Sequence, residues 1–541
     1  MCIVCADMSG QLRRSNFVSE EIGLDLAVSY GQRAAGVGPL AFLDLDERGG
    51  TAPNGKISLT PTDAGTQITR SGASWSTLGQ PATITYAFRS NAPTTMPSDT
   101  TGFSRFNVQQ IQATELMLQA WSDVARITFN RVGTGTEGDA AYSDSAVMLF
   151  GNYSAGQSGA AAFAYFPGST NHAANSGDVW INSSLSYNSA PGYLSYGYQV
   201  LLHEIGHGIG LGHPGDYNAG SGGPITYANS AEYYEDSRQY TVMSYFSETN
   251  TGGAFGGRYA ASPLLDDIAA AQRLYGANTA TRTGDTVYGF NSTADRMWYN
   301  AGTQLGPQAV IFAVWDAGGT DTLDFQYYTN GGLIDLRQGH FSSVGGLTGN
   351  VAIAMGAVIE NAIGGGGAET IIGNATANVL RGNGGNDQIE GGAGSDTAVF
   401  SGNRAQYTVT VGTEVVDGVT YGLITVAGPD GTDTLRNVEF LQFADETIAA
   451  PALTAGIRLE GDAAANILNG TSFADWLFGA DGIDTLNGGD GNDRLAGGRG
   501  NDTLNGGAGA DEADFSGANG AVSVNLGAGT AIGVGPTEPT P

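Results

Sequence analysis

Residues 203–213 read HEIGHGIGLGH, and this stretch decides how the first half of the chain folds and what it can bind. His203 and His207 are four residues apart, so on a helix both imidazoles lie on one face and can reach one metal ion. Gly210 can adopt the left-handed conformation that ends a helix and reverses the chain. His213 can then return as a third ligand. The stretch therefore predicts a helix that ends in a three-histidine metal site.

The chemistry of this site follows from its ligands. Three neutral nitrogen ligands leave a coordination position open for water, which is typical of a catalytic rather than a structural zinc site. Bound zinc lowers the pKa of water toward ~7, and a neighbouring carboxylate can take the proton as the nucleophile forms. Glu204 is that carboxylate and the expected general base. A helix that carries two histidines by chance is the alternative, and Gly210 and His213 at the required spacing argue against it.

The wider motif extends this interpretation. HExxHxxGxxH followed by a methionine turn at Met243, within YTVMSYF (240–246), resembles the metzincin zinc proteases. The sequences HPGDYNAG (213–220), EDSRQYTVMSYFSETNTGG (235–253) and PLLDDIAAAQRLYGANTATRTGDTVYGFNS (263–292) are similar to those of serralysins, over about residues 57–400. This resemblance implies that Met243 forms the floor under the zinc. It also implies that Tyr245 is a zinc ligand at rest that swings away to stabilise the oxyanion, with an ordinary buried tyrosine as the alternative.

A nine-residue pattern, GGxGxDxUx with U apolar, recurs in two arrays. It occurs as GNGGNDQIE (382–390) and GGAGSDTAV (391–399), and again in four units between residues 479 and 514. The glycines permit a tight turn with inward carbonyls, the Asp supplies a hard oxygen ligand for calcium, and the apolar residue packs inside a short strand. The resemblance to RTX proteins implies parallel β-rolls with calcium shared between turns eighteen residues apart. The alternative is a flexible glycine linker, which would not keep Asp and the apolar residue in phase.

The repeats give a set of expected calcium ligands. In the first roll Glu369 and Asn378 replace Asp, so we expect calcium there to be weaker or absent, and Asp475 lies in a weaker turn of the second roll. The expected ligands are Asp387 and Asp396 in the first roll and Asp484, Asp493, Asp502 and Asp511 in the second. The family resemblance implies two further calcium sites, one at Arg282, Gly284, Thr286, Asp316, Gly318 and Asp321, and one at Gly319, Asp321 and Glu360.

Changes in sequence texture divide the chain into six parts. Strands are expected at 83–88 and 146–150, and helices at 108–125, 198–210 and 263–276. The parts are a leader or prosegment (1–50), an α/β metzincin protease domain (51–277), an all-β first β-roll domain (278–400), a small antiparallel β insert (401–456), a second β-roll (457–515) and a tail (516–541). The tail ends in PTEPTP, a composition that should not pack.

Composition limits the partners. The 53 acidic and 22 basic residues give a net charge of −31, which disfavours nucleic acid and anionic membranes and favours cations. No apolar run approaches the ~20 residues of a membrane span, and MCIVCADMSGQLRR lacks the order of a secretory signal. The resemblance implies export by a type I system, so we expect a monomeric protein that is secreted or held at the cell surface.

Two functions remain open from sequence alone. The first is a zinc endopeptidase that hydrolyses extracellular proteins and is stabilised by calcium; the second is a calcium-dependent surface or adhesive protein with a vestigial protease domain. Cys2 and Cys5 could place a thiolate on the zinc and keep the enzyme latent, with incidental thiols in a disordered leader as the alternative. His172 and His340 have no ligand-spaced partners and are expected to be surface or hydrogen-bonded residues.

Overall fold

The computed structural model describes residues 42–97, 99–168, 176–218, 224–416, 418–515 and 517, and the backbone of 523–525 and 532–534. The described chain divides into two compact units. The N-terminal unit runs to Thr281 and includes Ile311–Trp315, and the C-terminal unit comprises Arg282–Val310 and the chain from Asp316 onward. Cys2, Cys5 and His172 lie outside the described residues. None of the helices in the described ranges combines the length and hydrophobicity that crossing a membrane requires.

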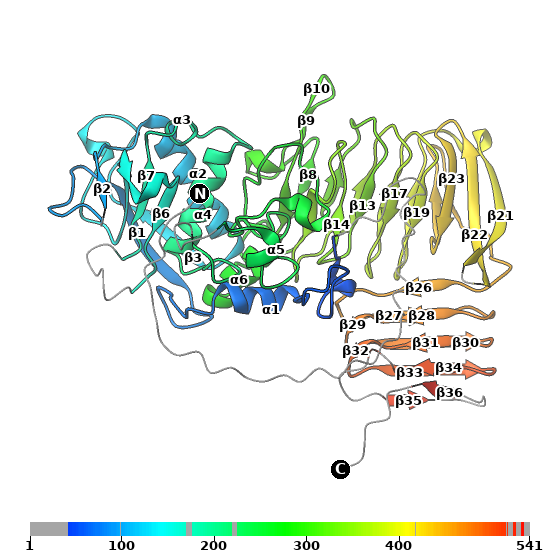
Figure 1. Ribbon diagram of the computed structural model, residues 1–541. Coiled ribbons are helices and arrows are strands. Elements are labelled where there is room, and N and C mark those ends of the chain that lie inside the picture. Colours follow the sequence, from blue (N-terminus) through cyan, green and yellow to red (C-terminus); the bar gives the residue numbers. More distant parts are fainter. Residues whose placement is uncertain are drawn as a thin grey trace, which may run out of the picture. The chain divides into compact units, whose positions relative to one another are not determined.

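A five-stranded sheet in the order β3-β1-β4-β7-β6 forms the centre of the N-terminal unit (Figure 1). All neighbours in it are parallel except β6 and β7. Strands β4 and β7 are buried at every residue, which is typical of parallel strands covered on both faces. The strands expected at 83–88 and 146–150 are β1 and β4. The bounds are β1 Ala82–Phe88, β3 Ile127–Arg131, β4 Met148–Tyr153, β6 Ala162–Ala164 and β7 Val179–Asn182, with β2 Thr100–Thr101 paired to β5 Ala155–Gly156, and β11 at Phe312–Val314.

The three helices expected from sequence are present as α2, α4 and α6. Helix α2 begins at an Asn107 cap, and its Trp121 Nε1 donates to the carbonyl of Leu202 on α4 at 3.2 Å. Ser195 caps α4, whose side chains from Gly197 to Gly208 are all buried. The helices are α1 Pro61–Ile68, α2 Val108–Val124, α3 Ser186–Ser189, α4 Tyr196–Gly208, α5 Tyr227–Ser230 and α6 Leu265–Tyr275, and the short 3-10 turns are η1 Leu45–Glu47, η2 Asp139–Ala141, η3 Gln157–Gly159 and η5 Glu248–Thr251.

Residues 42–59 form a strap that belongs to the N-terminal unit, although the sequence placed residues up to 50 in a leader. Phe42 is 1% exposed, and the Tyr240 hydroxyl donates to the carbonyl of Leu43 at 2.9 Å. Arg48 Nη2 donates to both carboxylate oxygens of Asp266 on α6 at 2.8 and 2.9 Å, and both side chains are fully buried. These partners lie about 200 residues away in the chain, so local sequence patterns could not reveal them.

Replacing Arg48 by methionine is expected to destabilise the N-terminal unit by about 3–5 kcal/mol, because it leaves the buried carboxylates of Asp266 and Glu235 without their cation. Urea denaturation followed by tryptophan fluorescence measures the loss. Arg105→Met is the matched control, since its pair with Asp139 is exposed. Adding Asp266→Asn should restore part of the stability, and a double variant no more stable than Arg48→Met would contradict the ion-pair explanation.

The first β-roll of the C-terminal unit has two sheets, in the orders β25-β24-β20-β18-β16-β12-β8 and β13-β17-β19-β23-β22-β21. Parallel neighbours between β16 and β20 are eighteen residues apart, as in the pairs Ala362 with Leu380 and Ile371 with Ile389. Strands β8, β12 and β13 pair with strands 35 to 39 residues further along the chain. The bounds are β8 Val287–Gly289, β12 Thr322–Asp324, β13 Leu333–Asp335, β16 Asn361–Ile363, β17 Thr370–Ile372, β18 Val379–Arg381, β19 Gln388–Glu390, β20 Thr397–Val399 and β25 Thr447–Ala449. Short additions are β9 Gly302–Thr303, β10 Gly306–Pro307, β14 Phe341–Ser342, β15 Val351–Ile353, η6 Met297–Tyr299 and η7 Arg404–Gln406.

The region expected as a separate antiparallel insert is spliced into this first roll. β21 (Thr408–Val416) and β22 (Val419–Gly428) form the expected antiparallel hairpin. β23 (Gly431–Arg436) then pairs in parallel with β19, and β24 (Phe440–Gln442) pairs in parallel with β20. Leu435 and Leu441 are buried where the repeat carries its apolar residue. The segment DGTDTL (430–435) keeps the G-x-D-x-U spacing of the repeat, which explains why it can continue the roll.

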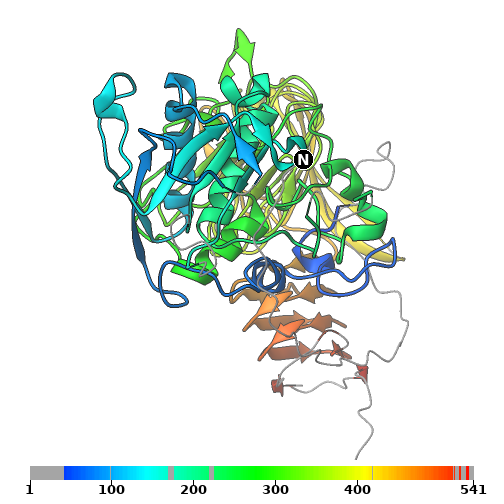
Figure 2. The same ribbon diagram turned by 60° about the vertical axis from the view of Figure 1, so that its left-hand side comes forward.

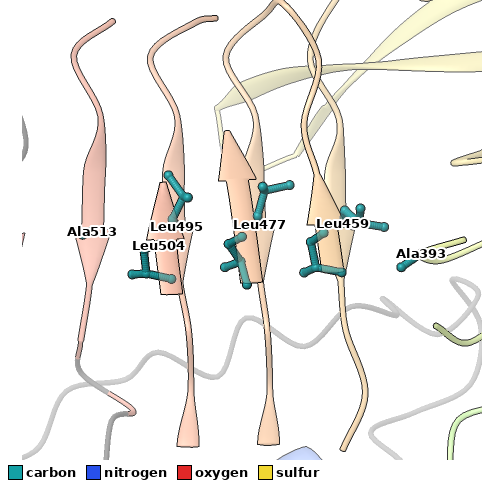
Figure 3. Close-up of a cluster of buried hydrophobic side chains, with 8 residues drawn as sticks. Ala393, Leu459, Leu477, Leu495, Leu504 and Ala513 are labelled. Atoms are coloured by element: carbon teal, nitrogen blue, oxygen red, sulfur yellow. The ribbon is translucent and has the colours of Figure 1, made fainter. Parts of the chain in front are cut away.

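The second β-roll consists of short rungs with a leucine core (Figures 1 and 2, orange to red). Leu459, Leu477 and Leu495 form one buried column, and Figure 3 shows it continuing to Ala393 of the first roll. One sheet contains β26 Arg458–Glu460, β28 Trp476–Phe478, β31 Arg494–Ala496, β34 Glu512–Asp514 and β36 Ile532–Val534; the other contains β27 Ile467–Asn469, β30 Thr485–Asp490, β33 Thr503–Ala508 and β35 Ser523–Asn525, with β29 Asp481–Gly482 paired to β32 Arg499–Gly500.

The roll extends beyond residue 515, where the sequence predicted a tail that does not pack. β35 pairs with β33, and β36 pairs with β34, both in parallel. The open edge of the last rung offers backbone hydrogen bonds to any segment that follows, whatever its side chains. The composition of the tail therefore does not prevent these short strands from forming.

Candidate zinc centre and calcium-binding turns

Three histidines converge at the end of α4. The Nε2 atoms of His207 and His213 are 3.1 Å apart, and those of His213 and His203 are 3.3 Å apart. Two nitrogens that bind one tetrahedral zinc at about 2.1 Å lie about 3.4 Å from each other, so the arrangement fits a zinc ion. Within the described ranges this is the one group of three or more histidine, cysteine or carboxylate side chains whose ligand atoms all lie within 4.8 Å of one another.

A backbone carbonyl fixes the tautomer of each histidine. His203 Nδ1 donates to the carbonyl of Val242 at 2.8 Å, His207 Nδ1 to that of Leu211 at 2.6 Å, and His213 Nδ1 to that of Tyr217 at 2.9 Å. A carbonyl can only accept, so the proton sits on Nδ1 and the lone pair on Nε2. All three lone pairs are therefore directed at the same point.

Burial keeps these imidazoles neutral. It lowers the pKa of His207 to about 4, and it holds the pKa values of His203 and His213 well below the usual 6.5. Repulsion between neighbouring imidazoles lowers the values for His203 and His213 further. A neutral imidazole is the form that binds a metal, so the site is ready for an ion across the neutral pH range.

Two glycines and a methionine shape the region around the histidines. Gly210 has φ +109°, and a Cβ there would lie 2.1 Å from the carbonyl oxygen of Ala73, so only glycine allows the turn toward His213. Met243 is fully buried beneath α4, where a Cβ on Gly206 would lie 2.6 Å from its sulfur. Met243 therefore packs against α4 at Gly206, the residue before His207.

The turn that contains Met243 is held from α6. Asp267 accepts a hydrogen bond from the Thr241 hydroxyl at 2.5 Å and another from the Val242 amide at 2.8 Å. The carbonyl of Val242 is the group that orients His203. Sequence reasoning missed Asp267, because its partners lie 25 and 26 residues away.

Tyr245 lies beside the three histidines. Its ring centroid is 4.5 Å from that of His213 and 6.1 Å from that of His203, and the side chain is half-buried. Glu204 follows His203 on α4 and is 1% exposed. The structure therefore brings His203, His207, His213, Tyr245 and Glu204 into one region. His340 is buried elsewhere, and its Nδ1 donates to the carbonyl of Gln338.

The Asp turns of the second roll fit calcium. Asp484 Oδ1 accepts a hydrogen bond from the Asn466 amide at 2.8 Å, whereas its Oδ2 is buried without a hydrogen-bond partner in the described chain. A Cβ on Gly479 would lie 2.5 Å from that Oδ2 and 2.6 Å from the carbonyl of Gly497, so both oxygens flank one small space. Asp493 and Asp502 also leave a buried Oδ2 without a partner among the residues that the structure describes, and Asp511 Oδ1 accepts from the Asp493 amide. An unsatisfied buried carboxylate oxygen is costly, and a hard cation satisfies it.

The Asn turns supply an internal contrast. Asn466 Nδ2 donates to Asp462 Oδ1 at 3.1 Å, and Asn378 Nδ2 donates to the carbonyl of Glu360 at 2.9 Å. The side-chain amides thus donate hydrogen bonds to oxygens of the turn that a cation would otherwise attract. Asp475 accepts from the amide and the hydroxyl of Thr471. At Asn378 and Asp475, the side-chain groups therefore have hydrogen-bond partners within the turn itself.

The first roll has the same arrangement at three carboxylates. Asp387 and Asp396 each leave a buried Oδ2 without a partner in the described residues. Glu369, where weaker calcium was expected, likewise leaves a buried Oε2 that has no hydrogen-bond partner in the described part of the chain. A Cβ on Gly364 would lie 3.2 Å from that Oε2 and 2.9 Å from the carbonyl of Gly382. The longer side chain therefore reaches the same kind of space as Asp does.

Sequence reasoning missed the last turn of this roll. The Asp387 amide donates to Asp433 Oδ1 at 2.9 Å, and the Asp396 amide donates to Glu439 Oε2 at 2.6 Å. Asp433 and Glu439 thus occupy the places that the next repeat would fill. The spacing of DGTDTL was the available signal for Asp433, but the hairpin before it broke the nine-residue period.

The residues expected to bind calcium at the start of the C-terminal unit also come together. The Thr286 amide donates to Asp321 Oδ1 at 2.7 Å, and the Asp321 amide donates to Glu360 Oε2 at 2.7 Å. Asp321 Oδ2 is buried without a partner among the described residues, and burial with the nearby carboxylates of Asp316 and Glu360 raises the pKa of Asp321 to about 7. Gly318 donates to Asp316 Oδ1, the carbonyl of Gly284 accepts from Thr286 Oγ1, Gly319 packs against Gly284, and Arg282 has φ +48°.

Comparison with protein families gives the class of protein. The family model described as Matrixin matches residues 78–221. The model described as Peptidase M10 serralysin C terminal matches residues 277–445, and the RTX calcium-binding nonapeptide repeat matches residues 460–493 and 478–513. The matrixin match and the three-histidine geometry together define a zinc metalloendopeptidase, followed by a strand-rich RTX region.

Curated relatives specify the family. Serralysin C of Dickeya chrysanthemi is 48% identical over 334 residues, which cover 61% of this chain and 68% of the relative. Metalloprotease AprA of Pseudomonas entomophila is 50% identical over 340 residues, which cover 61% of this chain and 67% of the relative. The chain belongs to the serralysin family.

Proposed function

We propose that the protein is a secreted endopeptidase that hydrolyses extracellular proteins, with zinc held by His203, His207 and His213 and with calcium holding both rolls. The observation that carries the proposal is the convergence of three neutral Nε2 atoms, 3.1 and 3.3 Å apart, beside the buried carboxylate of Glu204. The names of the relatives and the RTX repeats support the extracellular setting and the type I export route.

The residues divide the chemistry between them. When bound, zinc supplies a Lewis acid that polarises the scissile carbonyl and lowers the pKa of water. Glu204 accepts the proton of the attacking water and then delivers it to the leaving amine. Its burial excludes bulk water from that transfer. Tyr245 would ligate the zinc at rest, and its phenol would donate a hydrogen bond to the developing oxyanion.

Tyr245→Phe is expected to keep zinc and lower kcat by about 10²-fold with little change in KM, on the scale of one oxyanion donor. Steady-state kinetics on a fluorogenic peptide, with zinc content measured alongside, checks this result. Tyr227→Phe is the matched control, because Tyr227 belongs to the same aromatic cluster and its hydroxyl donates to the carbonyl of Tyr234. A normal kcat in Tyr245→Phe would reduce Tyr245 to a packing residue.

The calcium part of the proposal assigns a structural role to the turns. Asp387 and Asp396 with Asp433 and Glu439 would hold ions in the first roll, and Asp484, Asp493, Asp502 and Asp511 in the second. Glu369 would add a site, and Arg282, Gly284, Thr286, Asp316, Gly318, Gly319, Asp321 and Glu360 would form the two sites at the start of the C-terminal unit. The support is the set of buried carboxylate oxygens that lack a hydrogen-bond partner in the described chain.

Casein hydrolysis by the purified full chain tests the function. We expect activity that a zinc chelator abolishes and that added zinc restores. A protein that binds zinc stoichiometrically but leaves casein and denatured protein substrates uncleaved would overturn the proposal. That result would favour the calcium-dependent adhesive function with a vestigial protease domain.

A further inference from the structure

Asp236 is a fully buried carboxylate that none of the roles above uses. Its Oδ1 accepts two hydrogen bonds, from the Tyr217 hydroxyl at 2.7 Å and from Ser244 Oγ at 2.7 Å. Its Oδ2 is buried and has no hydrogen-bond partner in the part of the chain that the structure describes. A buried carboxylate with one unsatisfied oxygen costs stability. We therefore ask what function the two hydrogen bonds of Asp236 serve.

The first bond leads to the third zinc ligand. The Tyr217 ring stacks on the His213 imidazole, with centroids 5.3 Å apart and planes 10° apart. The carbonyl of Tyr217 also accepts the proton of His213 Nδ1. Tyr217 therefore determines both the tilt and the tautomer of His213. Asp236 holds the far end of the Tyr217 ring in place.

The second bond leads to Tyr245. Ser244 stands between Met243 and Tyr245, and its Oγ also accepts a hydrogen bond from the Phe246 amide at 3.1 Å. The Tyr245 ring lies 5.0 Å from the Tyr217 ring. The backbone on both sides of Tyr245 is thus tied to the same carboxylate that holds Tyr217.

We propose that Asp236 is a positioning residue that sets His213 and Tyr245 relative to each other, by joining Tyr217 and Ser244 through a single carboxylate oxygen. The inference rests on the proposed function, since it assigns Asp236 a part in the placement of a zinc ligand and of Tyr245. Removing a side chain that contacts a metal ligand, but not the metal itself, typically changes metal affinity or activity by about 10–100-fold. We expect effects of that size here.

Two single-bond variants of the full chain separate the two arms. Tyr217→Phe keeps the stacked ring but loses the hydroxyl, and it should weaken zinc binding about 10-fold and shift the visible spectrum of the cobalt-substituted protein. Ser244→Ala should lower kcat about 10-fold at unchanged KM and leave zinc affinity as in the wild type. Competition with a chromogenic chelator measures zinc affinity. Tyr227→Phe and Ser262→Ala, a buried serine elsewhere in the unit, are the controls.

Changes at Asp236 itself test whether an acceptor at this position is what matters. Asp236→Ala should show both losses, and Asp236→Asn, which keeps an acceptor oxygen, should recover most of each. Unchanged zinc affinity and cobalt spectrum in Tyr217→Phe would overturn the His213 arm, and unchanged kcat in Ser244→Ala would overturn the Tyr245 arm. Equal losses in Asp236→Asn and Asp236→Ala would overturn positioning through these bonds. A wild type that cleaves no protein would instead refute the proposed function, whereas the zinc affinity of Tyr217→Phe would still test the His213 arm.

Discussion

Glu204→Gln is expected to lower kcat by about 10²–10⁴-fold while zinc stays bound, because glutamine fills the same space but cannot accept a proton. Glu204 is 1% exposed on α4, directly after His203, so the substitution changes a buried proton acceptor and leaves the three ligands in place. Steady-state kinetics on a fluorogenic peptide gives kcat, and elemental analysis gives the zinc content.

The control for this experiment is Glu115→Gln, a half-buried glutamate on α2 that pairs with Arg131. It should leave kcat within a few-fold of the wild type. If Glu204→Gln retained wild-type kcat, a different group would be the base. If it lost its zinc together with its activity, the result would reflect the metal site and not proton transfer.

Removing calcium at neutral pH is expected to unfold both rolls, because it leaves buried carboxylates facing one another without a cation. Burial, with like charges beside them, raises the pKa of Asp484 and Asp433 to about 7 and that of Asp396 to about 8. These values lie above the unfolded value of about 4, so the calcium-free folded roll binds more protons than the unfolded chain. Its stability should be greatest below about pH 4 and fall as the pH rises through about 7.

The pH dependence of stability reverses when calcium is present, because the ion binds ionised carboxylates and acid displaces it. Thermal melts by circular dichroism compare calcium-stripped protein at about pH 5 and about pH 7.5 with calcium-loaded protein at the same two values. We expect the stripped rolls to melt higher at the acidic value and the loaded rolls higher at the neutral one. Equal melting temperatures of the calcium-stripped and the calcium-loaded protein at neutral pH would contradict the scaffold role of the ion.

Features with a short-range spacing could be predicted from sequence. Helix α4 and the convergence of His203, His207 and His213 follow from eleven consecutive residues, and the structure places them together. The apolar position of each repeat, such as Leu486, is buried as the period predicted. The chemistry in these cases depends on neighbours along the helix or one turn of the roll away.

Features that depend on distant partners could not be predicted. Arg48 pairs with Asp266, which lies 218 positions away, so no local pattern distinguishes residues 42–50 from a leader. In the sequence, Asp236 resembles any other acidic loop residue. Only the structure shows the hydrogen bonds that it accepts from the Tyr217 and Ser244 hydroxyls. The hairpin β21–β22 hid the last turn of the first roll, since the period resumes only after an interruption longer than the repeat itself.

That interruption shows what fixes the pitch of the roll. Most rungs return after eighteen residues, yet Gln388 pairs with Thr434 and Ala398 with Leu441, so 46 and 43 residues of chain produce the same advance. The excursion is closed at its base, where Asp430 accepts the Ser401 amide at 2.7 Å. The number of residues between two paired strands can therefore vary, provided that the two ends of the inserted segment are held together. The stretch between Ser401 and Asp430 is accordingly a suitable grafting position. A foreign loop or small domain could replace the hairpin there without disturbing the parallel stacking of the strands on either side.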